Sequence, residues 1–99
     1  MASLETFNPA YGSGVTVAPG TVSASTTIAS GNQSLCLTNL GSVVCYVRVT
    51  AAASTATAAD YPVPVGAQVT ISKSTDAVIV SYVTAAGTGS LHFMHGEGM

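Results

Sequence analysis

The segment from Ser34 to Thr50 constrains the fold more than any other part of the sequence. Apolar residues alternate with polar or β-branched residues on both sides of a break at 39–42, which reads Asn-Leu-Gly-Ser. Alternation with a period of two places successive side chains on opposite faces of a β-strand, and a break of this composition is typical of a turn. The segment therefore predicts an antiparallel hairpin with strands at 34–38 and 43–50.

Several other segments have the composition of short strands. Clusters of Gly, Pro, Asn and Ser separate them at intervals of roughly 8–12 residues, and no segment carries the apolar stripe of an amphipathic helix. The pattern predicts an all-β, single-domain antiparallel β-sandwich, jelly-roll-like, with about seven short strands. The expected strands outside the hairpin are 14–17, 21–28, 67–72, 77–83 and 90–94.

The composition of individual segments indicates a central strand, a long connection, an extended arm and a flexible end. The nearly unbroken apolar run 77–83 predicts a central strand that is covered on both faces. The low-complexity segment Ala51–Asp60 has no apolar stripe, and we expect it to be a long connection that crosses from one sheet to the other. Proline and glycine punctuate residues 1–20, which we expect to form an extended arm before a sandwich domain at 21–95. The end 96–99 is expected to be flexible.

The low content of charge restricts the classes of partner. Charged residues make up 6% of the 99 residues, against a usual share of about 25%. The surface is therefore built from small, neutral side chains, which suits burial against copies of the chain or another protein. A neutral extracellular module is the alternative interpretation. Two basic residues and a net charge of −2 argue against nucleic-acid binding. No apolar run approaches the roughly 20 residues that cross a bilayer, so no membrane partner is expected. The first residues lack the basic and apolar parts of a secretory signal.

No group of residues has the pattern of a catalytic site, so we expect a protein that is not an enzyme and uses no cofactor. The acidic residues Glu5, Asp60, Asp76 and Glu97 are scattered, whereas a paired-carboxylate site needs two that converge. The nucleophile motif Gly-x-Ser-x-Gly does not occur. The Gly-Thr-Gly sequence near the C-terminus lacks the third glycine and the following helix of a dinucleotide site.

Copper is the most specific metal hypothesis. His92, Met94, His95 and Met99 have the side chains of a blue-copper site, which also requires a cysteine. No cysteine precedes His92 in this part of the chain, and on a strand His95 faces away from His92 and Met94. We therefore predict no metal site and expect an ordinary strand end with a methionine that packs.

The two cysteines, Cys36 and Cys45, fall on the two strands of the predicted hairpin. A disulfide between adjacent strands is often strained, and two cysteines are too few for a disulfide scaffold. Free cysteine is among the residue types most often buried. We interpret both as small buried apolar residues, with a disulfide as the alternative.

Parts of the sequence resemble small virion proteins of tailed bacteriophages. The resemblance rests on Leu35–Arg48 with its Asn-Leu-Gly turn, on Tyr-Pro-Val-Pro-Val-Gly leading into the strand at 67–71, and on the closing Gly-Glu-Gly. Over about residues 33–98 the chain is similar to capsid decoration (cement) proteins, which are β-sandwiches or jelly rolls of similar length. The resemblance implies a structural protein on the capsid surface of the virion. Such a protein bridges neighbouring copies of the phage major capsid protein, often as a homo-oligomer (dimer or trimer).

No matched motif identifies a capsid-binding residue, so contacts are predicted from residue chemistry. We expect capsid or oligomer contacts at Phe7, Tyr11, Arg48 and Tyr61 and in the 51–60 connection. A solvated strand charge is the alternative for Arg48. Two other classes of function are alternatives: a head–tail joining or tail protein of the same virions, and a carbohydrate-binding sandwich module. Such modules usually present a row of exposed aromatic side chains.

Overall fold

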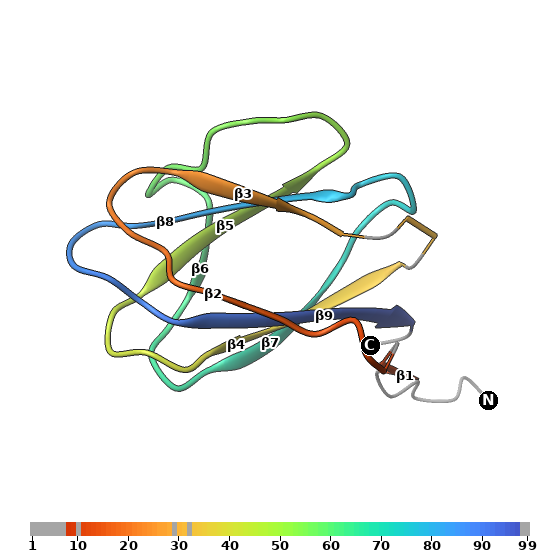
Figure 1. The fold of residues 1–99 in the computed structure, drawn as a ribbon, viewed down its shortest axis with the longest axis horizontal. Helices are drawn as coiled ribbons and strands as arrows, with labels where there is room; N and C mark the ends of the chain where they lie inside the picture. The colour runs from red at the N-terminus through yellow and green to blue at the C-terminus, as the bar shows by residue number, and fades with distance from the viewer. Residues whose placement is uncertain (1–7, 10, 29, 32, 98–99) are drawn as a thin grey trace.

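The computed structural model describes residues 8–9, 11–28, 30–31 and 33–97. Within these residues the chain forms nine strands and no helix, arranged as two facing antiparallel sheets (Figure 1). The predicted all-β sandwich is therefore confirmed. The strands are β1 (Asn8–Pro9), β2 (Val15–Val17), β3 (Ala24–Thr27), β4 (Ser34–Asn39), β5 (Cys45–Thr50), β6 (Tyr61–Val63), β7 (Gln68–Ser72), β8 (Ile79–Thr84) and β9 (Leu91–Glu97).

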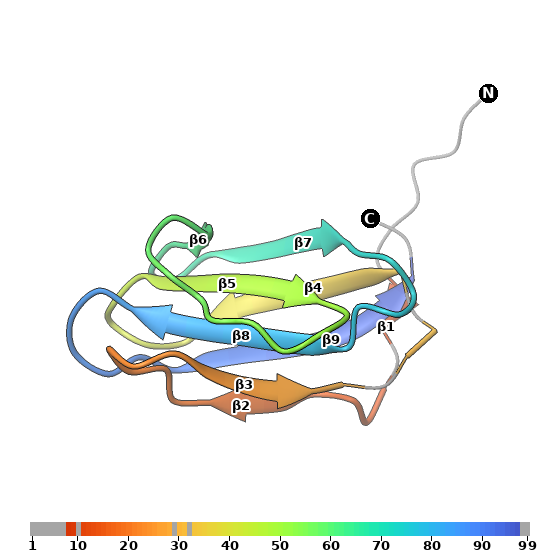
Figure 2. The ribbon, with the colours of Figure 1, turned by 90° about the horizontal axis from the view of Figure 1, so that it is seen from above.

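The strand order is that of a jelly roll. Sheet A has the order β1-β9-β4-β7, with β2 also paired to β9, and sheet B has the order β3-β8-β5-β6. The chain pairs β2 with β9, β3 with β8, β4 with β7 and β5 with β6, so that the first half folds back on the second as a nested antiparallel ribbon. Rolling this ribbon up adds the pairs β4–β9 and β5–β8, which close the two sheets (Figure 2). The expected jelly-roll-like class describes this topology.

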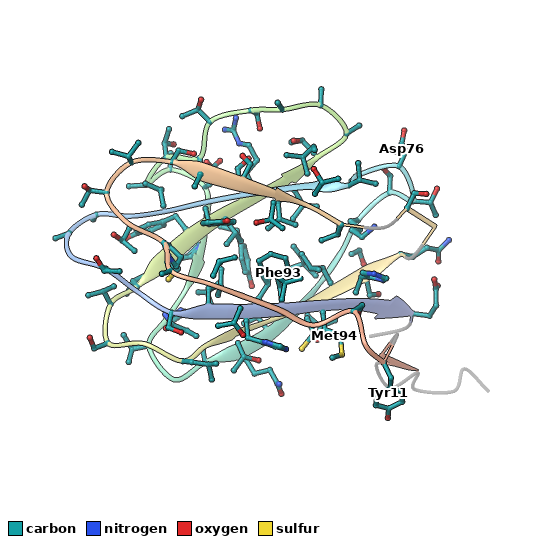
Figure 3. The ribbon with its side chains drawn as sticks, viewed as in Figure 1. Tyr11, Asp76, Phe93 and Met94 are labelled. Carbon is teal, nitrogen blue, oxygen red and sulfur yellow. The ribbon has the colours of Figure 1, made fainter. Side chains whose placement is uncertain are left out.

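The core lies between the two sheets and consists of aliphatic side chains, two aromatic rings and the thiol of Cys45. Sheet A contributes Leu35, Leu37 and Phe93, which are fully buried, and sheet B contributes Val80 and Tyr82 among others. The rings of Tyr82 and Phe93 meet across the core at a centroid distance of 6.3 Å, and Phe93 lies between the sheets in Figure 3. Burying each large apolar side chain contributes roughly 1.5–3 kcal/mol, so this cluster supplies the main driving force for folding.

The predicted hairpin at 34–50 is wrong, although both of its strands exist. β4 pairs with β7 and β9 in sheet A, whereas β5 pairs with β6 and β8 in sheet B. The two strands face each other across the core, with Leu37 on one side and Val47 on the other. Alternation determines which face of a strand is buried, but it does not determine which strand lies beside it. The segment is an arch between the sheets and not a hairpin within one.

The predicted crossing of Ala51–Asp60 between the sheets is also wrong. This connection joins β5 to β6, which are antiparallel neighbours in sheet B. It lies over the outer face of that sheet (Figure 2), where Ser81 Oγ donates a hydrogen bond to Ser54 O at 2.9 Å and Ala56 is 3% exposed. The predicted central strand at 77–83 is confirmed as β8, which lies between β3 and β5 and is buried along most of its length.

The strand count exceeds the expected seven because β1 and β6 are also present. β6 contains Pro62, whose missing N–H is tolerated because β6 is an edge strand. Strand pairing also extends beyond residues 21–95, since β1 and β2 pair with β9 and β9 continues to Glu97.

Candidate interaction surfaces

The antiparallel registers bring four connections together at one end of the sandwich. Leu91, the first residue of β9, lies opposite both Val17 and Asn39, the last residues of β2 and β4. Cys45, the first residue of β5, likewise lies opposite Val63 and Thr84, the last residues of β6 and β8. The connections β2–β3, β4–β5, β6–β7 and β8–β9 therefore meet at the left of Figure 1. We call this surface the four-loop end; it consists of residues 18–23, 40–44, 64–67 and 85–90.

The four-loop end is held together by backbone hydrogen bonds. Leu40 N–H donates to Ser90 O at 2.9 Å, and Gly89 N–H donates to Pro19 O at 2.8 Å. Thr84 N–H, at the end of β8, donates to a carbonyl of the β2–β3 connection at 2.8 Å. These bonds satisfy donors that loops otherwise leave to water, and they join three of the four connections to one another.

The four-loop end carries no charged residue. Val22, Leu40 and Val65 are exposed there by 81%, 60% and 52%. An open hollow of about 290 Å³ is lined by residues of two of these connections and by one tyrosine of β5: Val43, Val44, Ala85, Ala86 and Tyr46. Isolated exposed apolar residues are common on proteins, but several on one uncharged surface are typical of a contact site.

The charges that the structure describes lie elsewhere. Three of them lie at the opposite end of the sandwich, where β4 begins and both β7 and β9 finish. Lys73 and Asp76 follow β7, and Glu97 is the last residue of β9. The other two, Arg48 and Asp60, form an ion pair on the outer face of sheet B, with Nη2 to Oδ1 at 2.9 Å. The molecule therefore has a charged half and an uncharged end.

Arg48 anchors the connection that covers sheet B. Its Nε also donates to Asp60 Oδ1 at 3.0 Å, and Asp60 Oδ2 accepts the backbone N–H of Thr57 at 2.7 Å. The pKa of Asp60 is lowered, first by the hydrogen bond from the backbone of Thr57 and then by the hydrogen bond and charge of Arg48. Together these outweigh the opposing effect of desolvation. The guanidinium is therefore engaged within the chain while its side chain stays 40% exposed.

The other predicted contact residues do not gather on one surface. Tyr61 follows Asp60 at the start of the edge strand β6 and is 46% exposed. Tyr11 is 86% exposed and lies at the end of the sandwich opposite the four-loop end (Figure 3). Phe7 lies outside the described residues. Sequence reasoning missed the four-loop end, because its uncharged turns are far apart in the chain until the strand order is known.

A second hollow lies beside Tyr11. It has a volume of about 430 Å³ and is lined by Tyr11, Gly12, Ser13, Val15, Thr27, Ile28 and His95. Ser13 Oγ is buried and has no hydrogen-bond partner within the described residues. Burial, and secondarily the charge of Lys73, lowers the pKa of His95, so this imidazole is neutral near pH 7. The hollow is open to solvent, and no carboxylate or thiol lines it beside His95.

The sulfur and imidazole groups are divided between the two faces of sheet A. Met94 and Cys36 are cross-strand partners on its outer face, and Figure 3 shows Met94 on the opposite side of β9 from Phe93. His92 shares that face and is hydrogen-bonded through Nδ1 to Thr16 at 3.0 Å. His95 points the other way, and Met99 lies outside the described residues. Across residues 8–97, apart from the three positions left undescribed, no three His, Cys, Asp or Glu side chains group as metal ligands.

Both cysteines are free thiols. Cys36 is half-buried in sheet A and Cys45 is fully buried in sheet B, so the core separates them. Burial raises the pKa of the Cys45 thiol and keeps it protonated. The interpretation of both cysteines as small buried apolar residues therefore agrees with Cys45 but is wrong for Cys36, which is half-buried on the outer face of sheet A.

Comparison with known proteins adds no family to these observations: no protein-family model and no curated protein matches the chain. The part of the chain that the structure describes also has no helix with the length and hydropathy needed to cross a membrane.

Proposed function

We propose that this protein is a structural component of a bacteriophage virion that decorates the capsid and binds neighbouring copies of the major capsid protein through its four-loop end. The observation that carries the proposal is the absence of charge at this end, combined with the exposure of Val22, Leu40 and Val65. Burying small neutral groups against another protein avoids the desolvation cost of charged groups. The jelly-roll topology agrees with the proposal, because this architecture is common among virion proteins.

The size of the four-loop end agrees with a role in a repeated assembly. The two shorter dimensions of the molecule are 28 and 25 Å. An end of this cross-section offers roughly 550 Å², which is less than the about 800 Å² per partner of a standard interface. A single contact of this size is weak, whereas many copies on a lattice, each bridging two subunits, act together. Decoration of a shell therefore suits this surface better than a one-to-one complex.

The carbohydrate-binding alternative has less support. Such modules present several aromatic rings in one row, but the exposed rings described here, Tyr11 and Tyr61, belong to different parts of the molecule. An enzymatic function also has little support. One hollow is lined by His95 and the hydroxyl residues Ser13 and Thr27, but no carboxylate lines either hollow to orient the imidazole as a base.

Copy number tests the proposal. Particles of the phage that encodes the chain are purified on a density gradient, and quantitative mass spectrometry measures copies of this chain per copy of the major capsid protein. We expect a ratio of one or a simple fraction of one. About a dozen copies per particle would instead assign the chain to the neck or tail, where ring assemblies are common. Absence from the particles would refute the virion function.

Binding of variants to undecorated capsids tests the surface. Leu40→Asp introduces a charge at the four-loop end, and we expect it to weaken capsid binding at least tenfold. Tyr11→Ser removes a side chain that is even more exposed, at the other end of the molecule, and serves as the matched control. If Tyr11→Ser weakens binding and Leu40→Asp does not, the four-loop end is not the contact surface.

A further inference from the structure

The sandwich has four edges, and the sequence protects three of them. Edge strands expose backbone N–H and C=O groups, and proteins usually block them with prolines, charges or short strands. In sheet B, β6 has three residues and contains Pro62, and four-residue β3 is flanked by the 51–60 connection, where Ala56 N–H donates to Ser23 Oγ. In sheet A, β1 and β2 are two and three residues long.

The fourth edge, β7, has none of these protections. It is five residues long, reads Gln-Val-Thr-Ile-Ser, and contains no proline and no charge. Within the described residues its only strand partner is β4. Val69 and Ile71 turn inward and pack against the core, which fixes the position of the strand at the edge of sheet A.

The register shows which backbone groups of β7 point to the free side. Asn39 N–H donates to Ala67 O at 2.9 Å and Lys73 N–H donates to Gln33 O at 2.8 Å. Hydrogen-bonded pairs alternate along an antiparallel ladder, so Val69 and Ile71 also direct their N–H and C=O groups to β4. Thr70 lies between them and directs its N–H and C=O away from β4, to the edge.

We propose that β7 is a self-association site, at which two copies of the chain pair through their β7 strands, antiparallel, about a two-fold axis at Thr70. In this register Thr70 lies opposite Thr70 of the second copy, and the two residues exchange both backbone hydrogen bonds. Val69 then lies opposite Ile71 of the second copy, which continues the apolar face of sheet A across the junction.

The partner at the free edge of β7 is a second copy of the chain, because the strand is complementary to itself. No charge lies within β7, so an antiparallel copy places no like charges in opposition. Lys73 follows the strand, and the two-fold register places it opposite Ala67 of the second copy and not opposite the other lysine. The pairing uses the edge of sheet A and leaves the four-loop end, at the tips of the strands, available for another partner. It does not depend on the virion function.

The test uses the isolated full-length chain and analytical ultracentrifugation over a range of concentrations. We expect a reversible monomer–dimer equilibrium for the unmodified protein. Thr70→Pro removes the outward N–H without removing a bond to β4, and we expect it to weaken dimerisation at least tenfold. Thr70→Val keeps the N–H and serves as the matched control, with dimerisation unchanged. Circular dichroism checks that each variant is folded.

A charge-exchange experiment tests the register independently of the proline variant. Because Thr70 faces its own copy, Thr70→Lys alone and Thr70→Glu alone each place like charges in opposition and weaken dimerisation. An equimolar mixture of the two variants places lysine opposite glutamate and is expected to restore dimers, which are heterodimers by native mass spectrometry. A protein that stays monomeric at all accessible concentrations refutes the proposal. Dimers that neither charge variant weakens refute it equally.

Discussion

Replacement of Asn39 by alanine tests how the chain crosses from one sheet to the other. Asn39 is the last residue of β4 and is 2% exposed. Its Nδ2 donates to Val43 O and to Val63 O, each at 2.9 Å, and its Oδ1 accepts the N–H of Gly41 at 3.0 Å. One side chain therefore holds the arch after β4 and connects it to the end of β6 in the opposite sheet.

The expected cost follows from these three hydrogen bonds. Each bond contributes about 1 kcal/mol net, and a buried group left without a partner costs about 1–3 kcal/mol. We expect Asn39→Ala to lower the free energy of unfolding by about 3 kcal/mol, a large part of the roughly 5–15 kcal/mol typical of a domain. The midpoint of thermal unfolding then falls by roughly 12–24 °C, at about 4–8 °C per kcal/mol for a domain of this size.

Urea unfolding followed by far-UV circular dichroism measures this change, since the chain has no tryptophan. Thr38→Ala is the control, because Thr38 lies on the outer face of the same strand and accepts one hydrogen bond, from Gln68 Nε2 at 3.1 Å; we expect a change within about 0.5 kcal/mol. Asn39→Asp keeps the acceptor for Gly41 but places an oxygen against two carbonyls, so it should cost at least as much as alanine. A cost for Asn39→Ala as small as that of Thr38→Ala would refute the reasoning.

Three further predictions concern local packing and titration. Gly41→Ala places a Cβ 2.6 Å from the backbone N of Ser90, so urea unfolding should show a loss of about 1–3 kcal/mol; Gly20→Ala meets no atom within 4 Å and should be neutral or slightly stabilising. Folding lowers the pKa of Asp60, so the stability that this carboxylate contributes is present above its ordinary pKa of 3.8 and is lost as pH falls below that value. Below pH 3.8 the free energy of unfolding of Asp60→Asn should therefore fall less steeply with pH than that of the unmodified protein. The pKa of His95 is lowered from 6.5, so the unfolded chain takes up the proton first and stability falls as pH drops below 6.5. His95→Gln should lose that part of the pH dependence. If its free energy of unfolding falls with pH below 6.5 as steeply as that of the unmodified protein, His95 is not the group responsible.

The strands themselves were largely predictable from the sequence, because their signals are local. Alternation places Leu35 and Leu37 on one face of a strand and Cys45 and Val47 on one face of another, and in the structure these are the buried faces of β4 and β5. The apolar run in β8 correctly indicated a strand covered on both faces. β6 was missed because Pro62 opposes a strand assignment unless the strand is known to lie at an edge.

The candidate surfaces were less predictable, because each depends on residues that are distant in the chain. Arg48 was predicted as a contact residue, with a solvated strand charge as the alternative, and nothing local indicated that it pairs with Asp60 at the end of the 51–60 connection. The four-loop end joins Val22, Leu40 and Val65 from three separate turns. The free edge at β7 exists only because the sheet ends there.

By itself, the sequence determined the fold class, the inward residues of most strands and the scarcity of charge. These properties follow from the two-residue period of the extended backbone and from composition, and both can be read within a short window. Only the tertiary structure decided that β4 and β5 lie in opposite sheets, that uncharged turns meet at one end and that β7 forms an edge. Strand partners are chosen by the burial of surfaces that are far apart in sequence, and many pairings of the same strands satisfy the same local pattern.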